Sequence, residues 1–225
     1  MNIKRDHTKK VKKPWPTKEA MEQIYDMNLW GSDGSDFYSG EGSHHPNIKK
    51  PYVEKLSQFL ESFESPITVC DLGCGDFNVG KELVQYAKEY FAVDIVDSLI
   101  LRNKEKFKHD HVTFYCLDIA KDELPVADCA IIRQVFQHIS NAEIESTLAK
   151  LSAYRYVIIT EHLPNESFEP NIDIISGQGI RLKKKSGVDV LAPPFNFKAK
   201  KVTNLLTIPL GTNKGVLVTN LYETY

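Results

Sequence analysis

The sequence predicts an α/β fold with a mostly parallel central sheet and a C-terminal antiparallel hairpin. Apolar runs of strand length alternate with helical segments between residues 66 and 161, a pattern typical of βαβ units. A glycine-rich loop follows the first of these strands, where open parallel sheets bind ligands. Near the C-terminus, two more apolar runs flank a Gly-Thr-Asn-Lys-Gly turn, which indicates the hairpin.

The composition is that of one globular domain. The chain has 225 residues, 42% of them hydrophobic and 10% aromatic, which suffices for one core and is short for two. A net charge of −2 argues against a general attraction to nucleic acid. No apolar run approaches the roughly 18 residues of a membrane span, and the basic N-terminus lacks the apolar core of a signal peptide. We therefore expect a cytoplasmic protein.

The cysteines indicate a reducing compartment and no metal site. No Cys-x-x-Cys pair and no zinc-finger spacing of histidines occurs in the sequence. We interpret all of the cysteines as free, buried thiols. They are Cys70, Cys74, Cys116 and Cys129.

The segment before the alternating region is expected to cover the sheet. Residues 1–18 are rich in lysine and predict a flexible basic arm, with docking to an anionic partner as the alternative. Thr17 is placed to cap a short helix over residues 20–29. Residues 30–45 mix glycine and serine with aromatic side chains, which favours a lid or binding loop over a linker. A second helix is expected over residues 52–63.

Periodicity gives the remaining elements and the domain organisation. Strands are expected over residues 67–72, 91–95, 112–117, 127–133, 156–160, 202–209 and 216–222, and helices over 79–90, 98–107 and 141–151. After the arm, residues 19–225 are read as one domain. Its parts are the N-terminal helices and lid (19–65), the ligand-binding core (66–161), a proline-containing insertion on the substrate side (162–199) and the hairpin (200–225).

Three ligand classes use a glycine-rich loop like that of residues 71–82. A dinucleotide loop requires Gly-x-Gly-x-x-Gly, but Asn78 occupies the third glycine position. A phosphate-cradling loop fits until its last position, where Glu82 replaces the hydroxyl that would bind Mg²⁺. The acids Asp71 and Asp76 also disfavour phosphate. A sulfonium cofactor, which is cationic and carries no phosphate, tolerates these acids.

At this loop the chain resembles the class I S-adenosylmethionine-dependent methyltransferases, which have a Rossmann-like fold. Residues 71–75, Asp-Leu-Gly-Cys-Gly, match the first motif of that family between a strand and a helix. The resemblance implies that Asp94 binds the ribose and Asp118 the adenine, although either acid could simply cap a turn. Arg133 would hold the cofactor carboxylate or an anionic sugar, with an ion pair to Asp118 or Asp128 as the alternative. The residues assigned to the cofactor are Trp30, Ser39, Asp71, Gly73, Cys74, Gly75, Asn78, Asp94, Ile95, Asp118, Ile119, Arg133 and Gln134.

Four segments are similar to a bacterial subgroup of this family that is found with surface-polysaccharide genes. They are residues 28–31, 39–43, 76–78 and 193–197. This resemblance implies O-methylation of a sugar or glycan-related small molecule, nucleotide-linked or phosphorylated acceptors included, with S-adenosylhomocysteine as the product. The chain departs from the subgroup at Gln134, where an aspartate is usual, and at residues 161–164, where aromatic residues are usual. The acceptor and any acidic base therefore stay open.

Methyl transfer to a hydroxyl requires alignment of the reactants and removal of the hydroxyl proton. His138, after the fourth strand, is the preferred base because imidazole titrates near neutral pH; a hydrogen bond that stabilises the turn is the alternative. His162, after the fifth strand, is the second candidate, and Glu161 would orient it or contact the substrate. Two other functions stay open: a nucleic-acid or protein methyltransferase that docks through the basic arm, and a non-catalytic subunit that binds S-adenosylmethionine.

Overall fold

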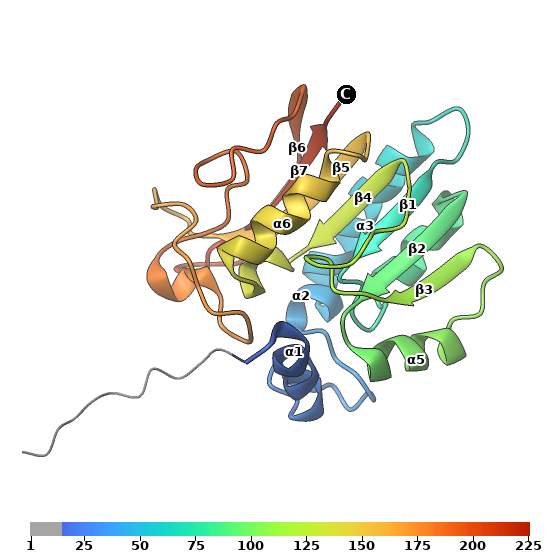
Figure 1. The fold of residues 1–225 in the computed structure, drawn as a ribbon, viewed down its shortest axis with the longest axis horizontal. Helices are drawn as coiled ribbons and strands as arrows, with labels where there is room; N and C mark the ends of the chain where they lie inside the picture. Colours follow the sequence, from blue (N-terminus) through green and yellow to red (C-terminus); the bar gives the residue numbers. More distant parts are fainter. Residues whose placement is uncertain (1–14) are drawn as a thin grey trace, which may run out of the picture.

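A seven-stranded sheet forms the centre of the computed structural model, which describes residues 15–225 (Figure 1). The strands are β1 (Thr68–Leu72), β2 (Glu89–Asp94), β3 (Val112–Cys116), β4 (Cys129–Arg133), β5 (Tyr156–Leu163), β6 (Lys201–Pro209) and β7 (Val216–Glu223). The α-helices are α1 (Thr17–Asp26), α2 (Glu41–His44), α3 (Pro46–Glu61), α4 (Gly80–Leu83), α5 (Asp97–Lys106) and α6 (Asn141–Leu151). Short 3₁₀ helices are η1 (Val84–Tyr86), η2 (Phe136–His138) and η3 (Arg181–Lys184).

The strand order is β3-β2-β1-β4-β5-β7-β6. Strands β1 to β5 are parallel, and β7 is antiparallel to both β5 and β6. This confirms the predicted α/β Rossmann-like fold with its C-terminal hairpin. The carboxyl ends of the parallel strands meet at one edge of the sheet, and α1 lies across that edge (Figure 1). The prediction of a flexible arm falls mainly on residues 1–14, which lie outside the described residues.

Two apolar layers hold the helices on opposite faces of the sheet. Leu72 and Ile132 pack on the face that carries α1, α5 and α6, whereas Val69 and Ile131 pack on the face that carries α3. Successive strand residues point to opposite faces, so a strand that is covered on both sides reads as a continuous apolar run. This is why β1 and β4 were recognisable without an alternating pattern.

The helix expected over residues 79–90 is much shorter in the structure. Only α4 and η1 are helical, and β2 already begins at Glu89. Tyr90 explains the change, because its side chain is fully buried and its hydroxyl donates to the Asp71 carboxylate over 2.9 Å. Its ring also packs edge-on against Phe77, with the ring centroids 5.7 Å apart. The sheet therefore includes a segment whose local pattern favoured a helix.

The N-terminal helices also differ from the prediction. Thr17 does not cap α1: the N-cap is Pro16, and the Thr17 hydroxyl donates instead to the Glu143 carboxylate. The helix expected over residues 52–63 is α3, which begins earlier than expected, at Pro46. A proline fits the first turn because its nitrogen would have no hydrogen-bond partner there. Residues 164–200 contain only η3 as regular structure.

No helix among residues 15–225 is long and apolar enough to cross a membrane. The cysteines within these residues are all free, as predicted, although only Cys70 and Cys129 are fully buried.

Candidate active site

A cavity of about 420 Å³ lies at the carboxyl ends of the parallel strands. Residues from α1, the lid and the insertion form its other walls. It is lined by most of the residues that the sequence assigned to a site, namely Trp30, Ser39, Gly73, Cys74, Gly75, Asp94, Ile95, Asp118, Ile119, Arg133, Gln134 and His138. Four assigned residues are not among its lining residues: Asp71, Asn78, Glu161 and His162.

The glycine loop approaches its neighbours too closely for side chains. Both Gly73 and Gly75 have positive φ angles, +85° and +56°, which glycine adopts at little cost. A Cβ atom on Gly73 would lie 2.3 Å from a methyl group of Val135, and one on Gly75 would lie 2.4 Å from the Ser39 hydroxyl. The loop therefore presents bare backbone to the cavity, as a closely bound adenosyl cofactor would require.

The two acids at the strand ends cap turns, as one of the alternatives predicted, and their side chains also line the cavity. Asp94 accepts backbone hydrogen bonds from Gly75 (3.0 Å) and Val96 (3.1 Å), and burial raises its pKa. Asp118 accepts from the Ala120 backbone over 3.0 Å and pairs with Lys121 over 2.7 Å. Each acid caps a turn and also lines the cavity. The turn contacts therefore position the carboxylates and do not exclude a role in binding.

The lid is attached to the glycine loop through Asp76. This carboxylate accepts from the Ser39 backbone (3.0 Å) and from Nε2 of His44 (2.5 Å). The Ser39 hydroxyl in turn accepts from the Asp76 backbone (2.8 Å) and lies 2.9 Å from the Tyr25 hydroxyl. Asn78 adds a further tie, because its amide donates to the Ser43 carbonyl over 2.8 Å. Asn78 therefore holds the lid in place from outside the cavity.

Arg133 and Asp71 make their contacts within the protein, beneath the lid and the glycine loop. The Arg133 guanidinium donates to the Gly42 carbonyl and to the Ser43 hydroxyl, and it lies over the Tyr52 ring at 4.7 Å. Among the described residues it forms no ion pair with an aspartate. Asp71 is buried beside a separate cavity of about 30 Å³, and burial raises its pKa to about 7. Arg133 thus ties the lid to the sheet, whereas Asp71 joins β1 to β2 through its hydrogen bond from Tyr90.

His138 lies in η2, and both of its ring nitrogens form hydrogen bonds within the protein. Its Nδ1 is 3.2 Å from the Gly177 carbonyl, which can only accept, so Nδ1 carries the proton. Its Nε2 then accepts from the Gln137 amide over 3.1 Å. The Trp30 ring packs beside the imidazole, with centroids 4.9 Å apart. Burial lowers the pKa of His138 to about 4, so the imidazole is neutral at neutral pH.

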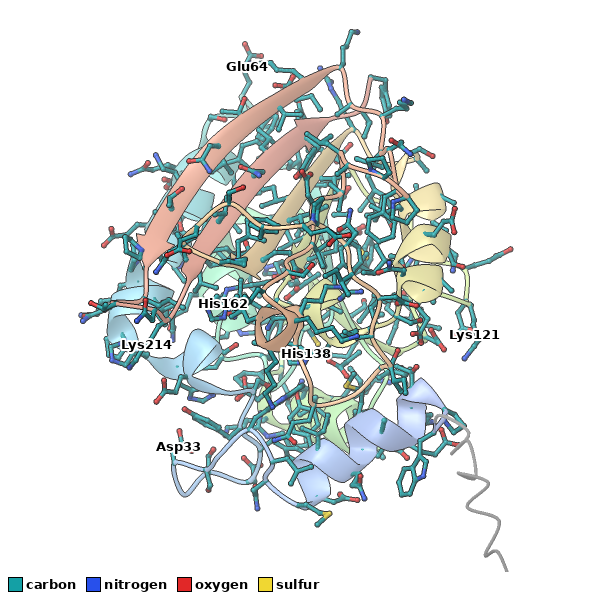
Figure 2. All side chains as sticks on the ribbon, turned by 90° about the vertical axis from the view of Figure 1, so that its left-hand side faces the viewer. Asp33, Glu64, Lys121, His138, His162 and Lys214 are labelled. Atoms are coloured by element: carbon teal, nitrogen blue, oxygen red, sulfur yellow. The ribbon has the colours of Figure 1, made fainter. Side chains whose placement is uncertain are left out.

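His162 and Glu161 lie away from the cavity, on the last part of β5. Nε2 of His162 donates to the carbonyl of Lys214, which Figure 2 shows at the turn of the β6–β7 hairpin. Glu161 is 4% exposed and accepts from the Phe136 backbone over 3.2 Å. Burial raises its pKa to about 8. Consecutive strand residues point to opposite faces, so Glu161 does not orient His162.

Sequence reasoning missed the residues that join α1, α6 and the insertion above the cavity. Glu143 lines the cavity and accepts from Ser140 and also from the hydroxyls of Thr17 and Ser176. The Ser-x-x-Glu spacing at residues 140–143 does signal a capping box, and the structure contains one. Nothing local signals the other two contacts. Tyr25, Gln137, Gln178 and Lys183 were likewise not assigned to the site, and all line the cavity.

The residues that the structure describes contain no candidate metal site. Among residues 15–225, no cluster of three or more His, Cys, Asp or Glu side chains is arranged to hold a metal ion.

Comparison with known proteins adds a family model and several similar folds. Residues 69–154 match a model described as a methyltransferase domain. The N-methyltransferase NodS from Bradyrhizobium japonicum WM9, in complex with S-adenosylhomocysteine, is 10% identical with a TM-score of 0.65, over 92% of this chain and 100% of that chain. Magnesium protoporphyrin IX methyltransferase (ChlM) from Synechocystis PCC 6803, with bound S-adenosylmethionine, is 14% identical with a TM-score of 0.59. The match covers 95% of this chain and 100% of that chain. No curated protein matches the sequence.

Human N-acetylserotonin methyltransferase, also in complex with S-adenosylmethionine, is 16% identical with a TM-score of 0.54, over 93% of this chain and 60% of that chain. The family model, the fold and the glycine-lined cavity all support S-adenosylmethionine as the cofactor, with S-adenosylhomocysteine as its product. The chain therefore has the Rossmann-like fold of the class I S-adenosylmethionine-dependent methyltransferases, and residues 69–154 match the model of a methyltransferase domain.

Proposed function

We propose that the chain methylates a hydroxyl group of a sugar or another glycan-related small molecule. Methyl transfer from S-adenosylmethionine is the part that the family model and the fold support. One observation carries the finer proposal: a neutral imidazole, His138, lines the same cavity as the bare glycine loop. A hydroxyl acceptor needs such a base, because its proton must leave as the new bond forms.

The cofactor would lie against the carboxyl ends of β1 to β4. The backbone of Gly73 and Gly75 would lie against the cofactor, and its methionine part would lie over the end of β4, as the family resemblance implies. Asp94 would bind the ribose hydroxyls, and Asp118 with Ile119 would contact the adenine. Each of these residues lines the cavity, and the acids keep free lone pairs beyond their backbone contacts.

The chemistry of the transfer is a displacement at carbon. S-adenosylmethionine supplies a methyl group that is activated by its positively charged sulfur; the carbon–oxygen bond forms as the carbon–sulfur bond breaks. The hydroxyl proton passes to Nε2 of His138, which requires the Gln137 amide to turn away from that nitrogen. The Gly177 carbonyl keeps Nδ1 protonated and would stabilise the imidazolium that results.

Lys183 favours acceptors that carry a phosphate. Its exposed side chain lines the cavity and forms no ion pair within the described residues. An ammonium group there would attract a nucleotide-linked or phosphorylated sugar. The resemblance to enzymes found with surface-polysaccharide genes supports the same class of acceptor.

Calorimetry tests the cofactor. We expect S-adenosylmethionine and S-adenosylhomocysteine to bind, and NAD and ATP not to bind. Asp94→Ala should weaken both ligands at least tenfold, because a buried hydrogen-bonding carboxylate is lost. Binding of NAD or ATP in preference to the sulfonium compounds would reject the proposal.

Turnover tests the base. In a screen of nucleotide sugars and glycans, we expect His138→Asn to lower kcat about 100-fold, since general bases contribute on the order of 10²–10⁴-fold. S-adenosylhomocysteine affinity should change less than threefold. The matched control is His162→Asn, which alters a histidine outside the cavity and should keep kcat. Unchanged kcat in His138→Asn would remove this residue as the base.

A further inference from the structure

Three glutamines from three separate segments line the cavity: Gln134 after β4, Gln137 in η2 and Gln178 in the insertion. Their side chains are neutral and can both donate and accept hydrogen bonds. The amide orientation of two of them is set by the protein. The Gln137 nitrogen donates to His138, and the Gln178 nitrogen donates to the Leu29 carbonyl over 2.7 Å.

The two amide oxygens are therefore left for other partners. Oε1 of Gln137 is buried and has no hydrogen-bond partner among the described residues. Turning the Gln137 amide over would set this oxygen against the lone pair of Nε2 of His138, so the amide nitrogen faces the imidazole until an acceptor hydroxyl takes its place. A buried acceptor without a donor costs on the order of 1–3 kcal/mol. The Gln137 oxygen therefore calls for a ligand that donates a hydrogen bond, whereas Gln178 is exposed and its oxygen is open to water or to the same ligand.

Gln134 is held in place at a conformational cost. Its backbone φ angle is +56°, in the left-handed region that a non-glycine residue rarely adopts. The lid passes over its amide at Gly42, where a Cβ atom would lie 2.2 Å from Oε1. Strained backbone of this kind clusters at functional sites. The geometry around Gln134 thus keeps an amide group at the cavity wall.

The charged side chains that line the cavity near these glutamines are either hydrogen-bonded to the protein or exposed at the rim. The Glu143 carboxylate accepts from Ser140, Thr17 and Ser176, and Arg133 donates to the lid. Glu41 and Lys183 line the cavity but are exposed. An ionised ligand group beside the glutamines would therefore lose hydration without a counter-charge.

We propose that Gln134, Gln137 and Gln178 form a neutral subsite that binds the hydroxyls of an uncharged, polyhydroxylated ring, with Trp30 as its aromatic wall. This inference rests on the proposed function and extends it, because it selects the part of the acceptor that lies next to His138. A carboxylate or phosphate would be repelled by the two amide oxygens. An ammonium group would find the nearby Glu143 carboxylate already hydrogen-bonded by Ser140, Thr17 and Ser176. Hydroxyl groups satisfy donors and acceptors together.

Nuclear magnetic resonance of the indole N–H groups tests the subsite, because the chain has only two tryptophans. Trp30→Phe assigns the Trp30 signal, and the exposed Trp15 serves as the internal reference. The probe is methyl α-D-glucopyranoside. Three matched controls are used. Tetrahydropyran-2-methanol lacks ring hydroxyls, the methyl α-glycoside of D-glucuronic acid carries a free carboxylate and is anionic, and glucosamine is cationic. Each probe is titrated into the free protein and into protein saturated with S-adenosylhomocysteine.

We expect the glucoside alone to shift the Trp30 signal in a saturable way, with the charged sugars binding at least tenfold more weakly. Gln137→Leu and Gln178→Leu should each weaken the glucoside about tenfold and leave S-adenosylhomocysteine binding unchanged. Gln85→Leu, an exposed glutamine in η1, should have no effect. Equal or tighter binding of a charged sugar, no Trp30 response to the glucoside, or glutamine variants that weaken only the cofactor product would each overturn the proposal. A protein that binds the glucoside and not S-adenosylhomocysteine would refute the proposed function and leave the subsite standing.

Discussion

Burial favours the neutral form of two ionisable side chains at η2, namely His138 at its end and Glu161, which contacts its first residue. It lowers the pKa of His138 to about 4 and raises that of Glu161 to about 8, since a low dielectric disfavours charge. His138 is therefore unprotonated at Nε2 at neutral pH, although the same burial makes it a weaker base than an exposed imidazole. Glu161 instead accepts from the Phe136 backbone and supports the turn that carries the histidine.

Glu161→Gln should stabilise the protein at alkaline pH. The unfolded chain releases this proton near pH 4.5 and the folded chain only near pH 8, so the free energy of unfolding of the wild type falls as the pH rises through that window. Glutamine removes this loss. We expect urea unfolding to show little difference between the proteins at pH 4.5 and a gain of a few kcal/mol for the variant at pH 8.5, as one pKa unit is worth about 1.4 kcal/mol. Parallel pH profiles for the two proteins would contradict this.

The insertion between β5 and β6 has little regular structure, and one side chain anchors it. Arg181 is 1% exposed and donates to the carbonyls of Phe136 (2.8 Å), Ile139 (3.0 Å) and Ile172 (3.1 Å). It also donates to the Asn141 side chain over 2.6 Å. These bonds join η3 to η2 and to the start of α6. The positions of Gly177 and Gln178 beside His138 therefore depend on this guanidinium.

Arg181→Met should lower the free energy of unfolding by about 3 kcal/mol or more, because buried carbonyl groups lose their donor. Limited proteolysis should cut the insertion faster than in the wild type. The matched control is Lys184→Met, which removes an exposed cation from the same 3₁₀ helix and should change stability by less than about 0.5 kcal/mol. Wild-type stability in Arg181→Met would show that packing alone holds the insertion.

At the scale of the whole molecule, the cavity is roofed by segments that do not belong to the sheet. The lid meets the glycine loop through Ser39 and Asp76 and meets α5 through Asp36, which pairs with Arg102 over 2.7 Å. These contacts are mainly polar, whereas the helices on the two faces of the sheet are held by apolar layers. A ligand that touches both the sheet and the roof should therefore add markedly to stability.

S-adenosylhomocysteine should raise the melting temperature in proportion to the logarithm of its concentration. At 100 times its Kd, the expected stabilisation is about 2.7 kcal/mol. Differential scanning calorimetry measures the shift, with ATP at the same concentration as the matched control. An equal shift with both compounds would indicate binding outside the proposed cofactor site.

The sequence by itself determined the order of the parallel strands along the chain, the hairpin and the glycine loop. These features depend on local periodicity and on residues that stand next to one another, such as Gly73 and Gly75. It also placed Asp94 and Asp118 at strand ends, and the topology then brought both acids to one edge. Local signals failed at Tyr90, because burial and a hydrogen bond to Asp71 on the neighbouring strand β1 outweighed the helical pattern.

Only the tertiary structure decided which side chains surround the cavity. Thr17 meets Glu143 across 126 positions of the sequence, and Gln178 meets Leu29 across 149. His162 turned toward the hairpin and Asp71 toward the interior, although both stood at positions typical of a site. Contacts over such distances depend on how separate elements pack, and no local pattern encodes that packing.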